Sequence, residues 1–141
     1  MSSSKAVVYL ADDDEDDRYF LRKALEDNDP SVTIVEAENG EDLLAMLDSW
    51  SQELASPPVH LILLDMNMPH VNGLEALAVI KANPLLRHIP TVMISTSADP
   101  NQVATAYRNG LNSYIQKPAS YAYVGQIVRA MKVCFLDAAV G

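Results

Sequence analysis

The sequence predicts a doubly wound α/β fold, with a five-stranded parallel sheet and helices on both faces. Short apolar runs of strand length alternate five times with segments whose apolar residues recur at helical spacing. One run, Leu61–Leu64, has four branched aliphatic residues in succession, which suits a strand buried on both faces. Because strands that alternate with helices form parallel sheets with right-handed crossovers, these two observations define the fold class.

The first half of the chain supplies two strand–helix pairs. We expect the first strand at Ala6–Leu10, followed by a helix whose N-cap is Asp14 and whose first turn is acidic, as the helix dipole favours. That helix ends at Asn28–Pro30. A second strand is expected at Val32–Val35, and Asn39–Asp42 opens a second helix.

The second half continues the alternation. Proline, glycine and asparagine mark most of its boundaries. The expected segments are a polar connector at Ser51–Pro58, a strand at Leu61–Leu64, a turn at Asn72-Gly73, a helix ending at Asn83-Pro84, a strand at Pro90–Ser95, a helix capped by Asp99-Pro100 and stopped by Gly110, a strand at Ser113–Gln116, and a last helix marked by Tyr121 to Met131.

Composition limits the classes of function. With 141 residues, of which 49% are hydrophobic, we expect one domain with a core over about residues 6–131, disorder over residues 1–4 and an extension of the last helix over residues 132–141. The net charge of −9 disfavours binding to nucleic acid. Cys134 is the only cysteine, and no run is long enough to span a membrane, so we expect a cytoplasmic protein.

Chemically competent side chains follow four of the predicted strands. Asp12 and Asp13 come after the first strand, Asp65 after the third, Ser95 at the end of the fourth and Lys117 after the fifth. The carboxyl ends of parallel strands meet at one edge of a sheet. Three carboxylates there repel one another unless positive charge is present, and a divalent cation such as Mg²⁺ together with Lys117 balances them.

These residues resemble the response-regulator receiver domain of two-component signalling. The resemblance rests on the acidic pair Asp12-Asp13, the run Leu64–Pro69, Ser95 and Lys117-Pro118, in order and at a spacing close to the chemotaxis-type pattern. It covers nearly the whole chain. It implies a flavodoxin-like (βα)5 sheet of order 2-1-3-4-5 and a signalling phosphoacceptor, not an enzyme.

The resemblance also implies a role for each site residue. Asp65 would accept a phosphoryl group from the phosphohistidine of a sensor histidine kinase. Lys117 would pair with the phosphoryl oxygens, and the Ser95 hydroxyl would bond to one of them. The expected ligands of Mg²⁺ (or Mn²⁺) are Asp13, Asp65 and the backbone carbonyl of Asn67, with Asp12 acting through a water.

A conformational switch is expected to follow phosphorylation. Ser95 would move toward the phosphoryl group, and Tyr114 would turn into the space left behind, which changes the face made by the fourth helix, the fifth strand and the fifth helix. Asn67 and Ser97 occupy the positions that tune phosphoryl lifetime in the family. The segment Asn83–Pro90 resembles stand-alone regulators that partner phytochrome-type kinases, which predicts a homodimer through the same face, where Val103 and Tyr107 lie.

Several other interpretations stay open. The chain could be a receiver that is never phosphorylated, a phosphatase of the haloacid dehalogenase type or a flavin mononucleotide binder. Asp14–Asp17 could serve only to cap a helix, Ser95 only to bond backbone, and Tyr114 only to fill the core. The acidic run alternates like a calcium-binding EF-hand loop, but Asp17 and Lys23 stand where that loop requires glycine and glutamate.

Overall fold

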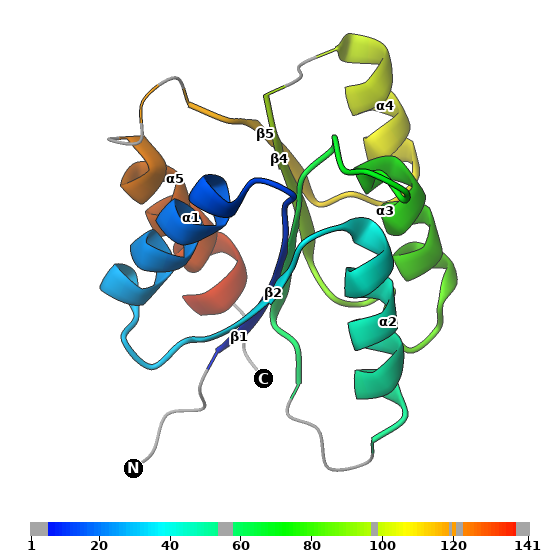
Figure 1. The fold of residues 1–141 in the computed structure, drawn as a ribbon, viewed down its shortest axis with the longest axis horizontal. Coiled ribbons are helices and arrows are strands. Elements are labelled where there is room, and N and C mark those ends of the chain that lie inside the picture. Colours follow the sequence, from blue (N-terminus) through cyan, green and yellow to red (C-terminus); the bar gives the residue numbers. More distant parts are fainter. Residues whose placement is uncertain (1–5, 54–57, 97–98, 119, 121–122, 138–141) are drawn as a thin grey trace.

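The computed structural model describes residues 6–53, 58–96, 99–118, 120 and 123–137, and places five strands in one parallel sheet (Figure 1). The strands lie in the order β2-β1-β3-β4-β5, and every pairing is parallel. The predicted fold class and strand order are therefore confirmed. The strands are β1 (Val7–Ala11), β2 (Thr33–Ala37), β3 (Leu61–Leu64), β4 (Thr91–Ser95) and β5 (Ser113–Gln116).

The helices cover both faces of the sheet. In Figure 1, α1 and α5 lie on one face and α2, α3 and α4 on the other. Each face has its own hydrophobic cluster, because β1, β3 and β4 are buried and turn successive side chains to opposite sides. The helices are α1 (Glu15–Asn28), α2 (Gly40–Ser51), α3 (Gly73–Ala82), α4 (Pro100–Arg108) and α5 (Val124–Met131), and the π-helix η2 (Lys132–Asp137) continues α5.

The helix boundaries follow the capping signals in the sequence. Asp14 accepts the backbone N–H groups of Asp16 and Asp17, Asn39 accepts that of Asp42, and Asp99 precedes a proline in the first turn of α4. Gly110 follows α4 with a φ of 98°, in the left-handed region that glycine adopts at low cost.

Two strands begin and end later than the sequence predicts. β1 runs from Val7 to Ala11 instead of Ala6–Leu10, and β2 ends at Ala37 instead of Val35. The reason is pairing, since Ala11 is in register with both Ala37 and Leu64, so the ladder extends to the acidic loop. The carboxyl end of the sheet therefore reaches directly to Asp12.

Among the described residues, no helix has the length and apolar character needed to cross a bilayer. The predicted disorder of residues 1–4 and the end of the C-terminal extension, residues 138–141, lie outside the described residues.

Candidate functional site

The polar residues predicted at the strand ends meet at the carboxyl edge of the sheet. Oxygen atoms from Asp12, Asp13 and Asp65 lie within 4.8 Å of one another. The Nζ atom of Lys117 lies 2.9 Å from Asp12 Oδ2 and 3.4 Å from Asp65 Oδ2. The pairing of β1 with β3 produces this cluster, because both strands end at the same level, where Ala11 pairs with Leu64.

The acidic cluster fits a divalent cation of the Mg²⁺ or Mn²⁺ type. Asp12 is 1% exposed and Asp65 is 6% exposed, whereas Asp13 reaches solvent. Hard cations prefer carboxylate oxygens, and the open side at Asp13 gives an ion an approach from water. Burial raises the pKa of Asp12 to about 6, against the opposing effect of hydrogen bonds from Asp14 and Lys117. Burial also raises the pKa of Asp65, so positive charge is needed to keep these carboxyls ionised.

Lys117 is the cation that the sequence places beside this cluster, and it is well sheltered, with 13% of its side chain exposed. Burial alone would lower the pKa of Lys117, but hydrogen bonds from its ammonium to Asp17 and Asp12, together with the charges of Asp12 and Asp65, raise that pKa overall. Lys117 is therefore charged at neutral pH.

Asp17 is a residue of this site that the sequence analysis missed. Its Oδ2 lies 2.6 Å from Lys117 Nζ, the shortest of the three ion pairs of Lys117. The helix-capping role considered for this acid belongs to Asp14, whose side chain accepts the N–H of Asp17. Topology could have indicated that Asp17 belongs to the site, because the first turn of α1 starts at the same edge of the sheet as the acidic cluster.

Ser95 is fully buried at the end of β4. The side-chain amide of Asn67 donates to its hydroxyl over 3.5 Å, and the backbone N–H of Asn67 donates to Asp65 Oδ1 over 3.3 Å. Asn67 thus connects the predicted phosphoacceptor to the predicted switch residue. Ser97 lies outside the described residues.

The loop after Asp65 is fixed by close backbone packing. The N–H of Gly73 donates to the carbonyl of Met66 over 2.9 Å, and a Cβ at Gly73 would lie 2.5 Å from the carbonyl oxygen of Asp65. His70, within the same loop, has a φ of 68°, a left-handed conformation that costs energy for a residue other than glycine. The position of Asp65 therefore depends on a tightly packed turn.

Tyr114 lies on β5 and is partly buried against the cluster of the α2, α3 and α4 face. Its backbone N–H donates to the hydroxyl of Tyr107 on α4 over 2.8 Å. This contact ties the edge strand to α4. The sequence analysis placed both tyrosines on this face but did not foresee the hydrogen bond.

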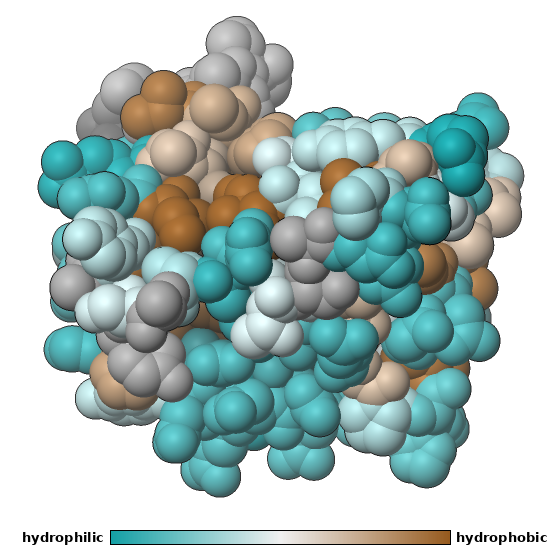
Figure 2. Space-filling view, turned by 90° about the horizontal axis from the view of Figure 1, so that it is seen from above, coloured by the Kyte–Doolittle hydropathy of each residue, from teal (hydrophilic) through white to brown (hydrophobic). Residues whose placement is uncertain are grey.

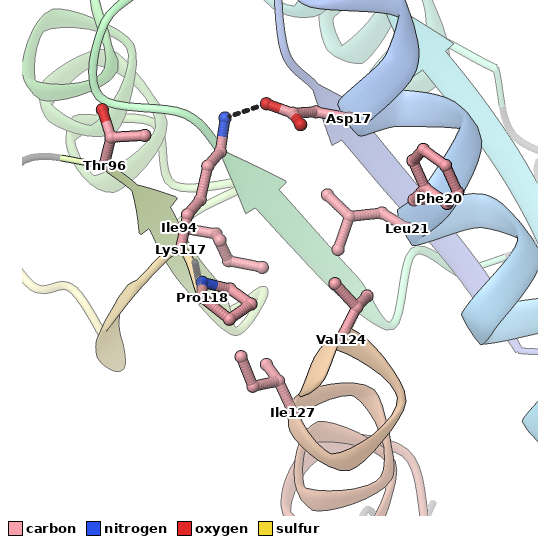
Figure 3. A pocket seen from close by; sticks show the side chains of 9 residues that line it. All are labelled: Asp17, Phe20, Leu21, Ile94, Thr96, Lys117, Pro118, Val124 and Ile127. Atoms are coloured by element: carbon pink, nitrogen blue, oxygen red, sulfur yellow. Dashed lines mark hydrogen bonds and ion pairs between the residues drawn. The ribbon is translucent and has the colours of Figure 1, made fainter. Parts of the chain in front are cut away.

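An apolar cavity of about 230 Å³ borders the site between α1, α5 and the ends of β4 and β5 (Figure 3). In Figure 2, hydrophobic residues bordered by hydrophilic ones lie on the left side of the molecule. This is the side on which α1 and α5 lie in Figure 1. The ion pair of Asp17 and Lys117 lies at one end of this cavity. Its apolar walls include Phe20, Leu21, Ile94, Val124 and Ile127.

Comparisons with known proteins agree with this arrangement. Response regulator Rcp1 of Synechocystis sp. is 29% identical over 136 residues, which cover 96% of this chain and 92% of that protein. The crystal structure of the phosphorylated cyanobacterial phytochrome response regulator RcpA superposes with a TM-score of 0.88 at 30% identity, covering 97% of this chain and 98% of RcpA. The Mn²⁺-bound form of Rcp1 gives a TM-score of 0.84 at 28% identity, covering 96% of this chain and 97% of that one.

These relatives are signalling response regulators and not enzymes, as predicted. RcpA is a phytochrome response regulator, which agrees with the subgroup that Asn83–Pro90 indicated. Residues 8–129 match the family described as the response regulator receiver domain. The chain therefore belongs to the response regulator receiver domain family.

Proposed function

We propose that Asp65 accepts a phosphoryl group from the phosphohistidine of a sensor histidine kinase. In this reaction an Asp65 carboxylate oxygen forms a bond to phosphorus while the bond from phosphorus to the histidine nitrogen breaks, and the imidazole leaves. The observation that carries the proposal is that Asp65 lies at the strand end beside both Lys117 and the acidic pair. Phosphoryl transfer needs alignment and neutralisation of charge, which this arrangement can provide.

Asp13, Asp65 and the backbone carbonyl of Asn67 would hold the divalent cation, Mg²⁺ or Mn²⁺. When bound, it would offset the negative charge of the carboxylates and of the phosphoryl oxygens. Asp12 would act through a water. Its carboxylate supports this role, because Oδ1 already accepts the N–H of Asp14 and Oδ2 already pairs with Lys117.

Lys117 and Ser95 would stabilise the phosphoryl group. The Lys117 ammonium is 3.4 Å from Asp65 Oδ2, so a small displacement of the lysine would reach the new oxygens. Ser95 would exchange its long contact with Asn67 for a hydrogen bond to a phosphoryl oxygen. A phosphoryl group carries about −1.5 to −2 charges and three acceptor oxygens, enough to favour both movements.

The output would be a change in the face formed by α4, β5 and α5. Movement of Ser95 would leave space into which the partly buried Tyr114 can turn. This face would then bind a downstream protein or form a homodimer, to which Val103 and the half-exposed Tyr107 would contribute. Asn67 and Ser97 would set the phosphoryl lifetime. We place this single receiver domain, with its core over about residues 6–131, in the cytoplasm.

The test is phosphorylation by a small phosphodonor in the presence of Mg²⁺. The wild-type protein should acquire one acid-stable, base-labile phosphoryl adduct, detected by mass spectrometry of the intact protein, and Asp65→Asn should acquire none. Omitting Mg²⁺ should abolish the adduct. Equal labelling of both proteins would refute Asp65 as the acceptor, and steady release of phosphate over many turnovers would indicate a phosphatase instead.

A further inference from the structure

The ammonium group of Lys117 is shared among three carboxylates. Its Nζ atom lies 2.6 Å from Asp17, 2.9 Å from Asp12 and 3.4 Å from Asp65. A lysine ammonium has three N–H donors, so each donor has a carboxylate acceptor in this state. The proposed phosphoacceptor has the longest of the three contacts, and Asp17 has the shortest. Figure 3 shows the contact between Asp17 and Lys117.

Any new contact from Lys117 to a phosphoryl oxygen must therefore replace an existing one, and apart from the long contact to Asp65 itself the candidates are those to Asp12 and Asp17. Asp12 is a poor candidate for release, because its side chain is 2% exposed and its Oδ1 accepts the N–H of Asp14. Asp17 is better suited, since 18% of its side chain is exposed and water can reach it. The first turn of α1 also stabilises the negative charge of Asp17 when its contact with Lys117 is lost.

The cavity beside the ion pair of Asp17 and Lys117 strengthens that ion pair. Asp17 and Lys117 both line the cavity whose other walls are mainly apolar. Water screens the attraction between the two charges less there than at an open surface. Capping of α1 does not account for the Asp17 carboxylate, because the side chain of Asp14 accepts the first backbone N–H groups of that helix.

We propose that Asp17 is a positioning residue that holds Lys117 away from Asp65 and so limits the affinity of the site for a phosphoryl group. The inference rests on the proposed function, because it presumes that Asp65 carries that group. Asp17 never touches the reacting atoms and acts only through Lys117. It keeps the lysine sheltered and charged in the unphosphorylated protein, and competes with the phosphoryl oxygens for it.

The test measures binding of beryllium trifluoride, a mimic of the phosphoryl group, by ¹⁹F NMR at saturating Mg²⁺. Asp17→Asn removes the competing charge and should lower the Kd of the mimic by about three- to tenfold, the range expected for one partly sheltered ion pair. Asp16→Asn is the matched control, because Asp16 lies in the same turn with an exposed side chain. Asp17→Glu restores the charge and should bind the mimic within about twofold of the wild type.

The outcomes separate this inference from the function on which it rests. Wild-type protein that binds no mimic and forms no adduct would overturn both. If the wild type binds the mimic but Asp17→Asn binds it equally or more weakly, or matches Asp16→Asn, only the role of Asp17 is overturned. Thermal unfolding without mimic identifies a variant that fails to fold, and in that case Asp17→Ser is measured in its place against the same criteria.

Discussion

The hydroxyl of Tyr107 accepts a hydrogen bond of 2.8 Å from the backbone N–H of Tyr114. β5 is an edge strand that pairs with β4 alone, so its outward N–H groups have no neighbouring strand to accept them. Unpaired edges of this kind invite pairing with another chain. A side chain from α4 therefore supplies the acceptor that a sixth strand would otherwise supply, at the residue expected to move in the switch.

Tyr107→Phe should loosen this edge without disturbing the fold. We expect faster hydrogen exchange at the Tyr114 amide and a loss of about 1 kcal/mol in the free energy of unfolding, the usual contribution of one hydrogen bond. Tyr19→Phe is the control, because Tyr19 and Tyr107 are both 47% exposed. Unchanged exchange at Tyr114 in Tyr107→Phe would show that the hydroxyl contributes nothing there.

The metal-free protein should lose stability as the pH rises toward neutrality, because of Asp12. Burial raises the pKa of Asp12 to about 6. A carboxyl whose pKa is higher in the folded state favours folding at acidic pH, and this contribution is lost as the pH rises from about 4 to about 6. Asp12→Asn stays neutral throughout, so it should raise the free energy of unfolding at pH 7 by about 2 kcal/mol. Urea denaturation from pH 4 to pH 8 measures the difference.

The control for Asp12→Asn is Glu15→Gln, which removes one negative charge from an exposed position in the same segment. It should change the unfolding free energy by less than about 0.5 kcal/mol. Mg²⁺ should then stabilise the wild type more than it stabilises Asp12→Asn, since the ion interacts with the charged form. A stability difference between wild type and Asp12→Asn that is the same at pH 4 and at pH 7 would contradict the burial argument.

Gly73→Ala should damage the site through the backbone of Asp65. The added Cβ would lie 2.5 Å from the Asp65 carbonyl oxygen and 2.8 Å from Met66 Cα, and backbone atoms cannot yield as a flexible side chain can. We expect a loss of about 2 kcal/mol or more in unfolding free energy and weaker phosphorylation of Asp65. Gly125→Ala, where the added Cβ would meet no atom within 4 Å beyond its own helix backbone and chain neighbours, should be neutral or stabilising by up to about 1 kcal/mol.

Ser95→Ala should separate phosphorylation from switching. Asp65 keeps Lys117 and the acidic pair in this variant, so beryllium trifluoride should still bind. Without the hydroxyl the mimic has no group with which to pull on the end of β4, and the NMR signals of Tyr114 should stay at their unliganded positions. Thr96→Ala, which removes the neighbouring exposed hydroxyl, should retain the Tyr114 shifts. If Ser95→Ala retains those shifts as well, the proposed coupling is wrong.

Local signals in the sequence predicted most of the fold. Asp14 and Asp99 cap their helices as expected, and Asn39 caps the helix that was expected to open at Asn39–Asp42, because a cap depends on residues only two or three positions away. The limits of β1 and β2 were less accurate, since a strand ends where its partners end. Asn72-Gly73 was expected to form a turn, but Asn72 and Glu75 form a capping box at the start of α3.

The site too has one part that the sequence predicted and another that it did not. The convergence of Asp12, Asp65 and Lys117 followed from strand topology and was predictable. The pairing of Asp17 with Lys117 and that of Tyr107 with Tyr114 were not, because each depends on how far a helix sits from a strand end. A sequence pattern gives the face of a helix but not that distance.

The ion pair between Lys117 and Asp12 joins residues 105 positions apart. β5, which carries the lysine to the cluster, follows the other four strands of the described sheet and is paired with β4 alone. A nascent chain that has released only its first four strands from the ribosome thus has its acids in place without their cation, so its carboxylates repel one another. The charge balance of the site is completed only when β5 and Lys117 have been released, and it distinguishes a chain with its sheet complete from one that has only the first four strands.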